Sequence, residues 1–148
     1  MSRPDDLKLI ALDAEDLTVI SAHVQDAVLK VGDLAFEPAR HRFSLAMNRF
    51  AWEAASRRTR GFERRRAMLH FDRVLKVASS RIDRRAPDVV LELLAISFAP
   101  DDEPAGVIVL HFAGGPEIRL TVECIEAQLA DLGAAWQTKA RPAHDLPA

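Results

Sequence analysis

Hydrophobic residues recur at helical spacing in only one part of the N-terminal half of the chain. Leu17, Ile20, Val24 and Val28 are separated by three or four residues, which predicts an amphipathic helix over about 14–27. Asp13 is a suitable N-cap, and the acidic side chains that follow it favour the first turn of a helix. The preceding run, LKLIAL at 7–12, is either a strand or a lead-in to the helix.

From Val28 onward the hydrophobic period changes to two, the period of a half-buried strand. Turn signals at 32–33 and 37–38 divide this region into short pieces. A nearly continuous apolar run at 89–98 predicts a central strand, and a glycine-rich connection at 113–116 predicts a hairpin. The clearest strands are at 42–50, at 67–77 with a bend near Arg73, at 89–98, at 107–112 and at 117–122.

The end of the chain returns to helical spacing. Ile125, Leu129, Leu132 and Trp136 stand at i, i+4, i+7 and i+11, which predicts a closing amphipathic helix. The last ten residues, 139–148, are predicted to fray, so a single domain is expected over 1–138.

These elements predict an α+β fold with an N-terminal helix, six to seven antiparallel strands and a C-terminal amphipathic helix. The strands would form a bent sheet or an open barrel that the last helix closes at one end. Strands and helices do not alternate, which argues against a parallel nucleotide-binding sheet. In its element order this arrangement resembles the pleckstrin-homology-like fold.

Composition adds limits to this picture. The 148 residues are 49% hydrophobic and 28% charged, as in an ordinary globular domain. The single cysteine, Cys124, excludes an intramolecular disulfide. The chain has neither a secretory signal pattern nor an apolar run of about 20 residues, so we expect a cytoplasmic protein with no membrane partner.

Charge is strongly separated along the chain, although the formal net charge is only −2. Residues 1–39 carry a balance of −5, residues 40–85 a balance of +10 and residues 86–148 a balance of −7. Within the basic part, the stretch 54–66 has no apolar period and is predicted to be an arginine-rich loop. Such a density of cations attracts anionic partners.

Three interpretations of this stretch stay open. It is a solvated loop, or it binds an acidic protein surface or the acidic part of a second copy, or it binds RNA, DNA or another anion with Trp52 stacking on bases. A sequence pI of about 6.2 weighs against nucleic acid. The candidate binding residues are Arg49, Trp52, Arg57, Arg58, Arg64, Arg65, Arg66 and His70.

A histidine–carboxylate pair offers the one hint of catalysis. His70 and Asp72 are two residues apart on a predicted strand and so share a face, where a carboxylate can orient a general base. The same pair is also an ordinary surface contact, and no nucleophile motif accompanies it. The histidines lack ligand spacing, so neither a metal site nor a cofactor is predicted.

The order of sequence blocks resembles a bacterial family, domain of unknown function family 2948. The resemblance spans about residues 7–136 and includes RFSLAMNRFAWE, RRAMLHFDRVLKV, VLELLAISF and GGPEIRLTVECIEAQLADLGAAW. It implies a cytoplasmic bacterial protein made of this one domain, and it implies no activity or site residue. Together with the separated charge, the missing catalytic constellation predicts a non-enzymatic protein-binding or adaptor module that uses an arginine-rich surface.

Overall fold

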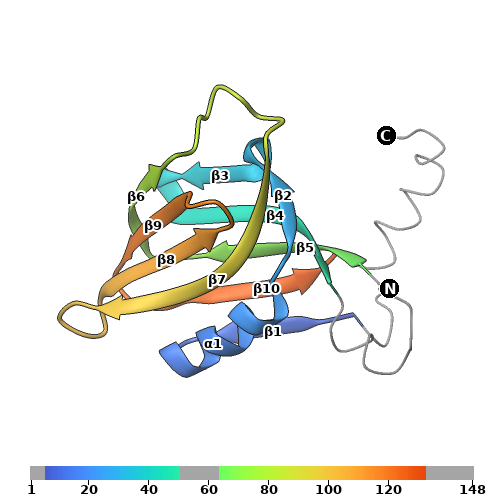
Figure 1. Cartoon of the computed structure of the whole chain (residues 1–148). Helices are drawn as coiled ribbons and strands as arrows, with labels where there is room; N and C mark the ends of the chain where they lie inside the picture. Colours follow the sequence, from blue (N-terminus) through green and yellow to red (C-terminus); the bar gives the residue numbers. More distant parts are fainter. Residues whose placement is uncertain (1–5, 51–63, 133–148) are drawn as a thin grey trace.

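A computed structural model describes residues 6–50 and 64–132, which form one strongly curved antiparallel sheet and one helix (Figure 1). The elements are β1 (Lys8–Ala11), α1 (Ala14–His23), β2 (Val28–Lys30), β3 (Leu34–Glu37), β4 (Arg42–Phe50), β5 (Arg64–Phe71), β6 (Val74–Ser80), β7 (Val90–Pro100), β8 (Gly106–Phe112), β9 (Glu117–Val122) and β10 (Ala127–Asp131). Two short 3-10 turns, η1 (Val31–Asp33) and η2 (Pro38–Arg40), flank β3.

The strands follow the order β1-β10-β5-β4-β2-β7-β8-β9-β6, and β3 pairs with β4 beside this path. The sheet curls until β6 approaches η2, where the Val74 amide donates to the His41 carbonyl at 2.9 Å. Beyond that bond β3 and β6 are not paired with each other, so the curled sheet stays open along this seam.

Helix α1 begins where its cap predicts. The Asp16 amide donates to Asp13 Oδ1 at 2.8 Å, and the Leu12 amide donates to Asp16 Oδ2 at 3.1 Å. Leu17 and Ile20 turn inward and are buried. The helix ends at His23, four residues earlier than the apolar spacing predicts, and Asp26 adopts a left-handed conformation before β2.

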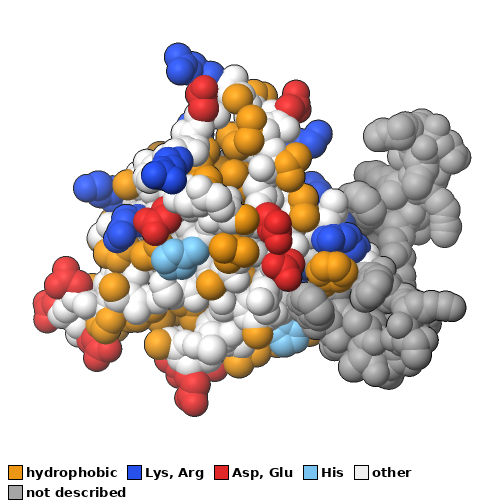
Figure 2. Space-filling view, in the orientation of Figure 1, with side chains coloured by type: hydrophobic (Ala, Val, Ile, Leu, Met, Phe, Trp, Pro, Cys, Tyr) orange, Lys and Arg blue, Asp and Glu red, His pale blue; other side chains and the backbone are white. Residues whose placement is uncertain are grey.

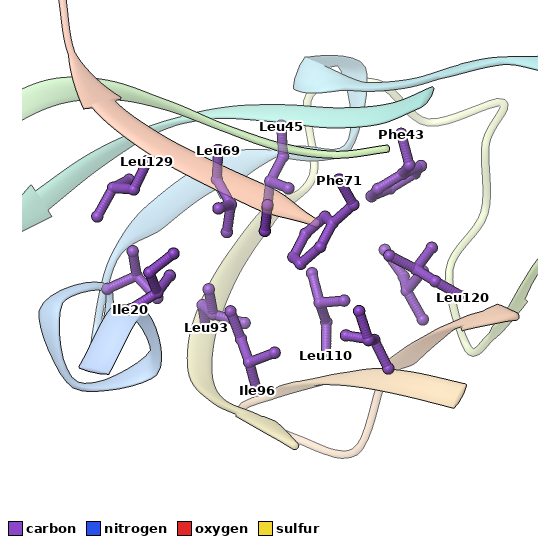
Figure 3. Packing of buried hydrophobic residues seen from close by; sticks show 14 of the residues in the cluster. Ile20, Phe43, Leu45, Leu69, Phe71, Leu93, Ile96, Leu110, Leu120 and Leu129 are labelled. Atoms are coloured by element: carbon purple, nitrogen blue, oxygen red, sulfur yellow. The ribbon is translucent and has the colours of Figure 1, made fainter. Parts of the chain in front are cut away.

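The hydrophobic core fills the interior of the curl (Figure 3). Alternate residues of β4, β5 and β10 point inward toward alternate residues of β7, β8 and β9, as the period-two pattern requires. Side chains that meet there include Leu45, Leu69, Phe71, Leu93, Leu110, Leu120 and Leu129, and Ile20 of α1 joins them.

Several strand predictions are confirmed. The predicted strand 67–77 is β5 followed by β6, with the bend at Arg73 in a left-handed conformation. The predicted hairpin joins β8 to β9, where Gly114 and Gly115 have φ angles of 92° and 108° that other residues rarely adopt. The run LKLIAL contains strand β1.

The predicted C-terminal helix is wrong over the residues that the structure describes. Residues 127–131 form strand β10, which pairs with β1 on one side and β5 on the other. Ile125, Ala127 and Leu129 alternate into the core, so the apolar residues satisfy a strand period as well as a helical one. The rest of the predicted helix and the predicted tail at 139–148 lie outside the described residues.

The α+β class is therefore correct in outline, but its details differ from the prediction. The described part of the chain has ten strands rather than six or seven, and its helix lies between β1 and β2. It has no C-terminal helix, so the pleckstrin-homology-like arrangement is not supported. The described helix is too short to cross a membrane.

Candidate functional site

Some of the predicted binding residues lie outside the described part of the chain, and the others lie on two neighbouring strands. Trp52, Arg57 and Arg58 lie outside the described residues. The predicted arginine-rich loop ends earlier than expected, because strand β5 begins at Arg64. The remaining candidates are Arg49, Arg64, Arg65, Arg66 and His70, all on β4 and β5.

Arg49 and Arg65 point into the interior, which corrects their assignment to an exposed surface. They face each other across β4 and β5 on the inward side of the sheet. The Arg49 side chain has no exposed surface and binds the equally buried Asp131 carboxylate through two hydrogen bonds of 2.9 Å. Arg65 Nη1 binds Asp6 Oδ1 at 3.0 Å, again with both side chains nearly buried. These pairs hold β1 and β10 against β4 and β5.

Arg64 and Arg66 point outward from the same strand. The Arg64 guanidinium lies 4.1 Å from the centroid of the Phe50 ring, a cation–π contact on the exposed side. Arg66 Nη1 donates to Asn48 Oδ1 at 3.3 Å, and Arg66 Nη2 lies 3.7 Å from Asp33 Oδ1. Arg66 is therefore held in place by neighbours on β4 and η1.

A groove of about 290 Å³ lies beside Arg66. It opens because β2 pairs with β4 only through Val28 and Asn48, whereas all three residues of β2 pair with β7. We call it the basic groove, lined by Val28, Leu29, Lys30, Asp33, Asn48, Arg66 and Val90.

The basic groove combines two cations with apolar surface. The Lys30 ammonium is 58% exposed, and its nearest described carboxylate, that of Asp88, is 3.9 Å away and almost fully exposed. Val90 on the opposite wall is 59% exposed; the exposed Val89 precedes it, and the exposed Leu94 lies further along β7, beyond Glu92. Apolar side chains are visible along the upper part of β7 in Figure 2. An anionic group with an apolar neighbour would find complementary contacts in the groove.

His70 belongs to a separate cluster on the outer face of β5. Its Nε2 atom lies 3.6 Å from Asp72 Oδ2, which is too long for a hydrogen bond. The Asp72 carboxylate instead accepts two hydrogen bonds from Arg42, at 2.7 and 3.3 Å. Burial lowers the pKa of His70, and the positive charge of Arg42 lowers it further. His70 is thus neutral near pH 7 but lacks a carboxylate that orients it.

The enzyme hypothesis needs this pair to line a concave pocket. Neither His70 nor Asp72 lines the basic groove or either of two other cavities lined by described residues. The described residues also contain no group of three or more side chains of the kind that holds a metal ion. In the outer-face cluster, the Asp72 carboxylate is paired with Arg42, and His70 lies beside this ion pair.

Another cavity lies at the acidic end of the molecule. It has a volume of about 380 Å³ and opens between the start of α1 and the turn joining β7 to β8. Its lining includes Leu12, Asp13, Glu103 and Cys124, and acidic side chains gather at this end in Figure 2. The separation of charge along the sequence thus becomes, in part, a separation in space.

Lys30 and Val90 were not among the residues singled out from the sequence. The turn at 32–33 lies in η1, just after β2 ends at Lys30, and it did not reveal that β2 pairs with β4 only at Val28.

The chain matches the family model described as protein of unknown function (DUF2948) over residues 7–144 and belongs to that family. No curated protein and no solved structure matches it.

Proposed function

For this member of the DUF2948 family, we propose a role as a protein-binding module that holds an acidic, partly apolar segment of a partner in the basic groove. The observation that carries the proposal is a guanidinium fixed in position at the edge of a groove that also offers an exposed, weakly paired ammonium and an exposed valine. A cytoplasmic location and an adaptor role belong to the same proposal.

The arrangement of Arg66 suits a carboxylate. A guanidinium carries five N–H donors, and the contacts with Asn48 and Asp33 use only part of this capacity. Because those contacts already restrict the side chain, less entropy is lost when a ligand binds. Arginine also binds carboxylates through two parallel hydrogen bonds, which fixes the direction of approach.

Lys30 and the apolar wall supply the other half of the interaction. The Lys30–Asp88 contact is long and exposed, so it competes weakly with a ligand carboxylate. At about 290 Å³, the groove accepts one or two side chains rather than a whole small molecule of the size that fills typical sites of about 300–1,000 Å³. The rest of a partner segment would lie along Val89, Val90 and Leu94. Trp52, Arg57 and Arg58 remain contacts proposed from the sequence alone.

The test uses an array of short peptides that combine aspartate or glutamate with leucine or valine, and the full-length protein. We expect peptides with an acid next to an apolar residue to bind and to shift the backbone amide signals of Lys30, Asn48 and Arg66. Lys30→Glu with Arg66→Glu should weaken binding at least about tenfold, since hydrogen bonds to charged groups are lost and repulsion is added.

The matched control reverses two exposed cations elsewhere, Lys8→Glu with Arg119→Glu, and it should change affinity by less than about threefold. Binding that is equally weak in the control would contradict a specific groove. Tighter binding by a single-stranded oligonucleotide that displaces the peptide, with a steep loss of affinity in salt, would favour the nucleic-acid alternative instead.

A further inference from the structure

Strand β6 has a free edge. It pairs with β9 on one side only, and the path of strands ends there. Within the described residues, the backbone of 75–80 forms no hydrogen bond beyond that pairing, and Val74 alone reaches across to His41. Residues 75–80, which contain no proline, therefore present one edge of the strand without a partner.

The neighbouring hairpin shows which backbone groups point to this edge. The Phe112 amide donates to the Pro116 carbonyl at 3.0 Å across the β8–β9 turn. In an antiparallel pair the bonding residues alternate, so Leu110 and Ile118 also exchange hydrogen bonds. Arg119, next along β9, must then direct its amide and carbonyl away from β8 and toward β6.

The same alternation carries over to β6. Arg119 lies opposite Ala78, so Ala78 directs its backbone groups to β9. Val77 and Ser79, on either side of it, direct their amide and carbonyl groups to the free edge. Those two residues hold the donors and acceptors that an additional strand would use.

A cavity lies at the same place. Its volume is about 100 Å³, enough for an aliphatic side chain when compared with the ~150 Å³ cavities that hold benzene. Strand β3, whose outer edge is also unpaired, forms the opposite wall. The cavity is lined by Leu34, Ala35, Phe36, Phe43, Val77, Ser79, Ile82, Arg84 and Ile118.

We propose that the free edge of β6 binds an extended segment of a partner protein by strand addition, with one apolar side chain in the cavity and one carboxylate at Arg84. Strand addition takes its affinity from backbone hydrogen bonds and its specificity from pockets for alternate side chains, and this edge has both. No described residue forms an ion pair with Arg84, whereas its neighbours Asp83 and Arg85 pair with each other. Arg84 is thus available to a carboxylate.

Charge selects a partner protein over a second copy of this chain. The edge carries Lys76, and Arg81 and Arg84 follow its end. Two copies joined edge to edge would bring these cations together, which is unfavourable and is a common protection against self-pairing. The proposal does not use the basic groove, so either can fail without the other.

The test uses peptides in which threonine alternates with valine or leucine, with a glutamate at either end, and the full-length protein. Binding should slow hydrogen exchange of the Val77 and Ser79 amides at least about tenfold, because a hydrogen-bonded amide must open before it exchanges. Ser79→Pro removes an edge-facing amide without touching the β9 pairing and should weaken binding about tenfold. Ser79→Ala keeps the amide and should bind within about threefold of the original chain.

Where Ser79→Pro disturbs folding, a peptide with methylated backbone amides replaces it and should bind equally poorly. Slowed exchange at Val77 and Ser79, lost with the methylated peptide, supports the proposal. It is overturned when no peptide slows exchange at this edge, when methylation leaves affinity unchanged, or when the same amides are already protected in a dimer of the chain without peptide.

Discussion

The buried ion pair between Arg49 and Asp131 makes a sharp prediction about stability. Both side chains are inaccessible to solvent, and both hydrogen bonds between them are 2.9 Å long. Asp131 also accepts a hydrogen bond from the Leu7 amide at 2.8 Å, so one carboxylate fastens β4, β10 and the start of β1 together. Asp131→Ala would leave a buried guanidinium without this carboxylate and would remove the acceptor of the Leu7 amide.

The expected cost is about 3–5 kcal/mol in the free energy of unfolding, which is typical of breaking a buried pair by removing one partner. For a chain of this size that corresponds to a fall in Tm of roughly 10 °C. Urea denaturation followed by far-ultraviolet circular dichroism measures the free energy directly. The matched control is Asp33→Asn, because the Asp33–Arg66 contact is partly exposed and 3.7 Å long, and its loss should cost less than about 1 kcal/mol.

The double variant Arg49→Met with Asp131→Leu distinguishes the net contribution of the ion pair from the cost of leaving one buried charge without its partner. When both charged groups are replaced by apolar ones of similar size, the loss should be well below that of Asp131→Ala. A cost for Asp131→Ala no larger than that of the control would contradict this prediction. So would a double variant whose loss of unfolding free energy equals the sum of the losses of Arg49→Met and Asp131→Leu measured separately.

Three further predictions follow from individual contacts. Asp13→Ala removes the N-cap of α1 and should cost about 1 kcal/mol, measured by urea denaturation; an unchanged midpoint would contradict the cap. Because burial lowers the pKa of His70 below its ordinary 6.5, the native state resists its protonation, so the stability this group contributes should be full above about pH 6.5 and fall as pH drops through the folded pKa. His70→Gln should flatten the stability profile between about pH 7.5 and 5, and an identical profile would exclude this contribution. Gly106→Ala would place a methyl group 2.5 Å from the Ala99 carbonyl oxygen and 2.6 Å from the Phe98 ring and should cost about 1–3 kcal/mol, seen as a lower Tm; an unchanged Tm would contradict this clash.

Local patterns predicted much of the fold correctly. The period-two alternation located β4, β5, β8 and β9, because residues of one face are buried together whatever strand lies next to them. The cap at Asp13 located the start of α1 for an equally local reason.

The predictions failed where strand pairing decides the outcome. Residues 125–132 satisfy both a helical and a strand period, and what selects the strand is the space between β1 and β5. The pairing of β1 with β10 joins residues more than 115 positions apart in the chain, which no local pattern reports. Tertiary context therefore overrode the local preference.

The candidate site also combines features that a local pattern predicts with features that only strand pairing decides. The alternation of Phe43, Leu45 and Met47 already places Arg49 on the buried face, so its interior position was readable from the sequence. Its partner Asp131 was not, because it is contributed by β10. The basic groove likewise depends on β2 pairing with β4 at one position only, a feature of the sheet rather than of any one segment.

The central claim is that the basic groove recognises an acidic, partly apolar protein segment. The most direct test is a titration of the isotope-labelled full-length protein with the best peptide from the array, followed through its backbone amide signals. The account predicts shifts concentrated at Lys30, Asn48, Arg66 and Val90, lost in the Lys30→Glu with Arg66→Glu variant and kept in the Lys8→Glu with Arg119→Glu control. Shifts that lie elsewhere, or that survive reversal of both groove cations, would contradict it.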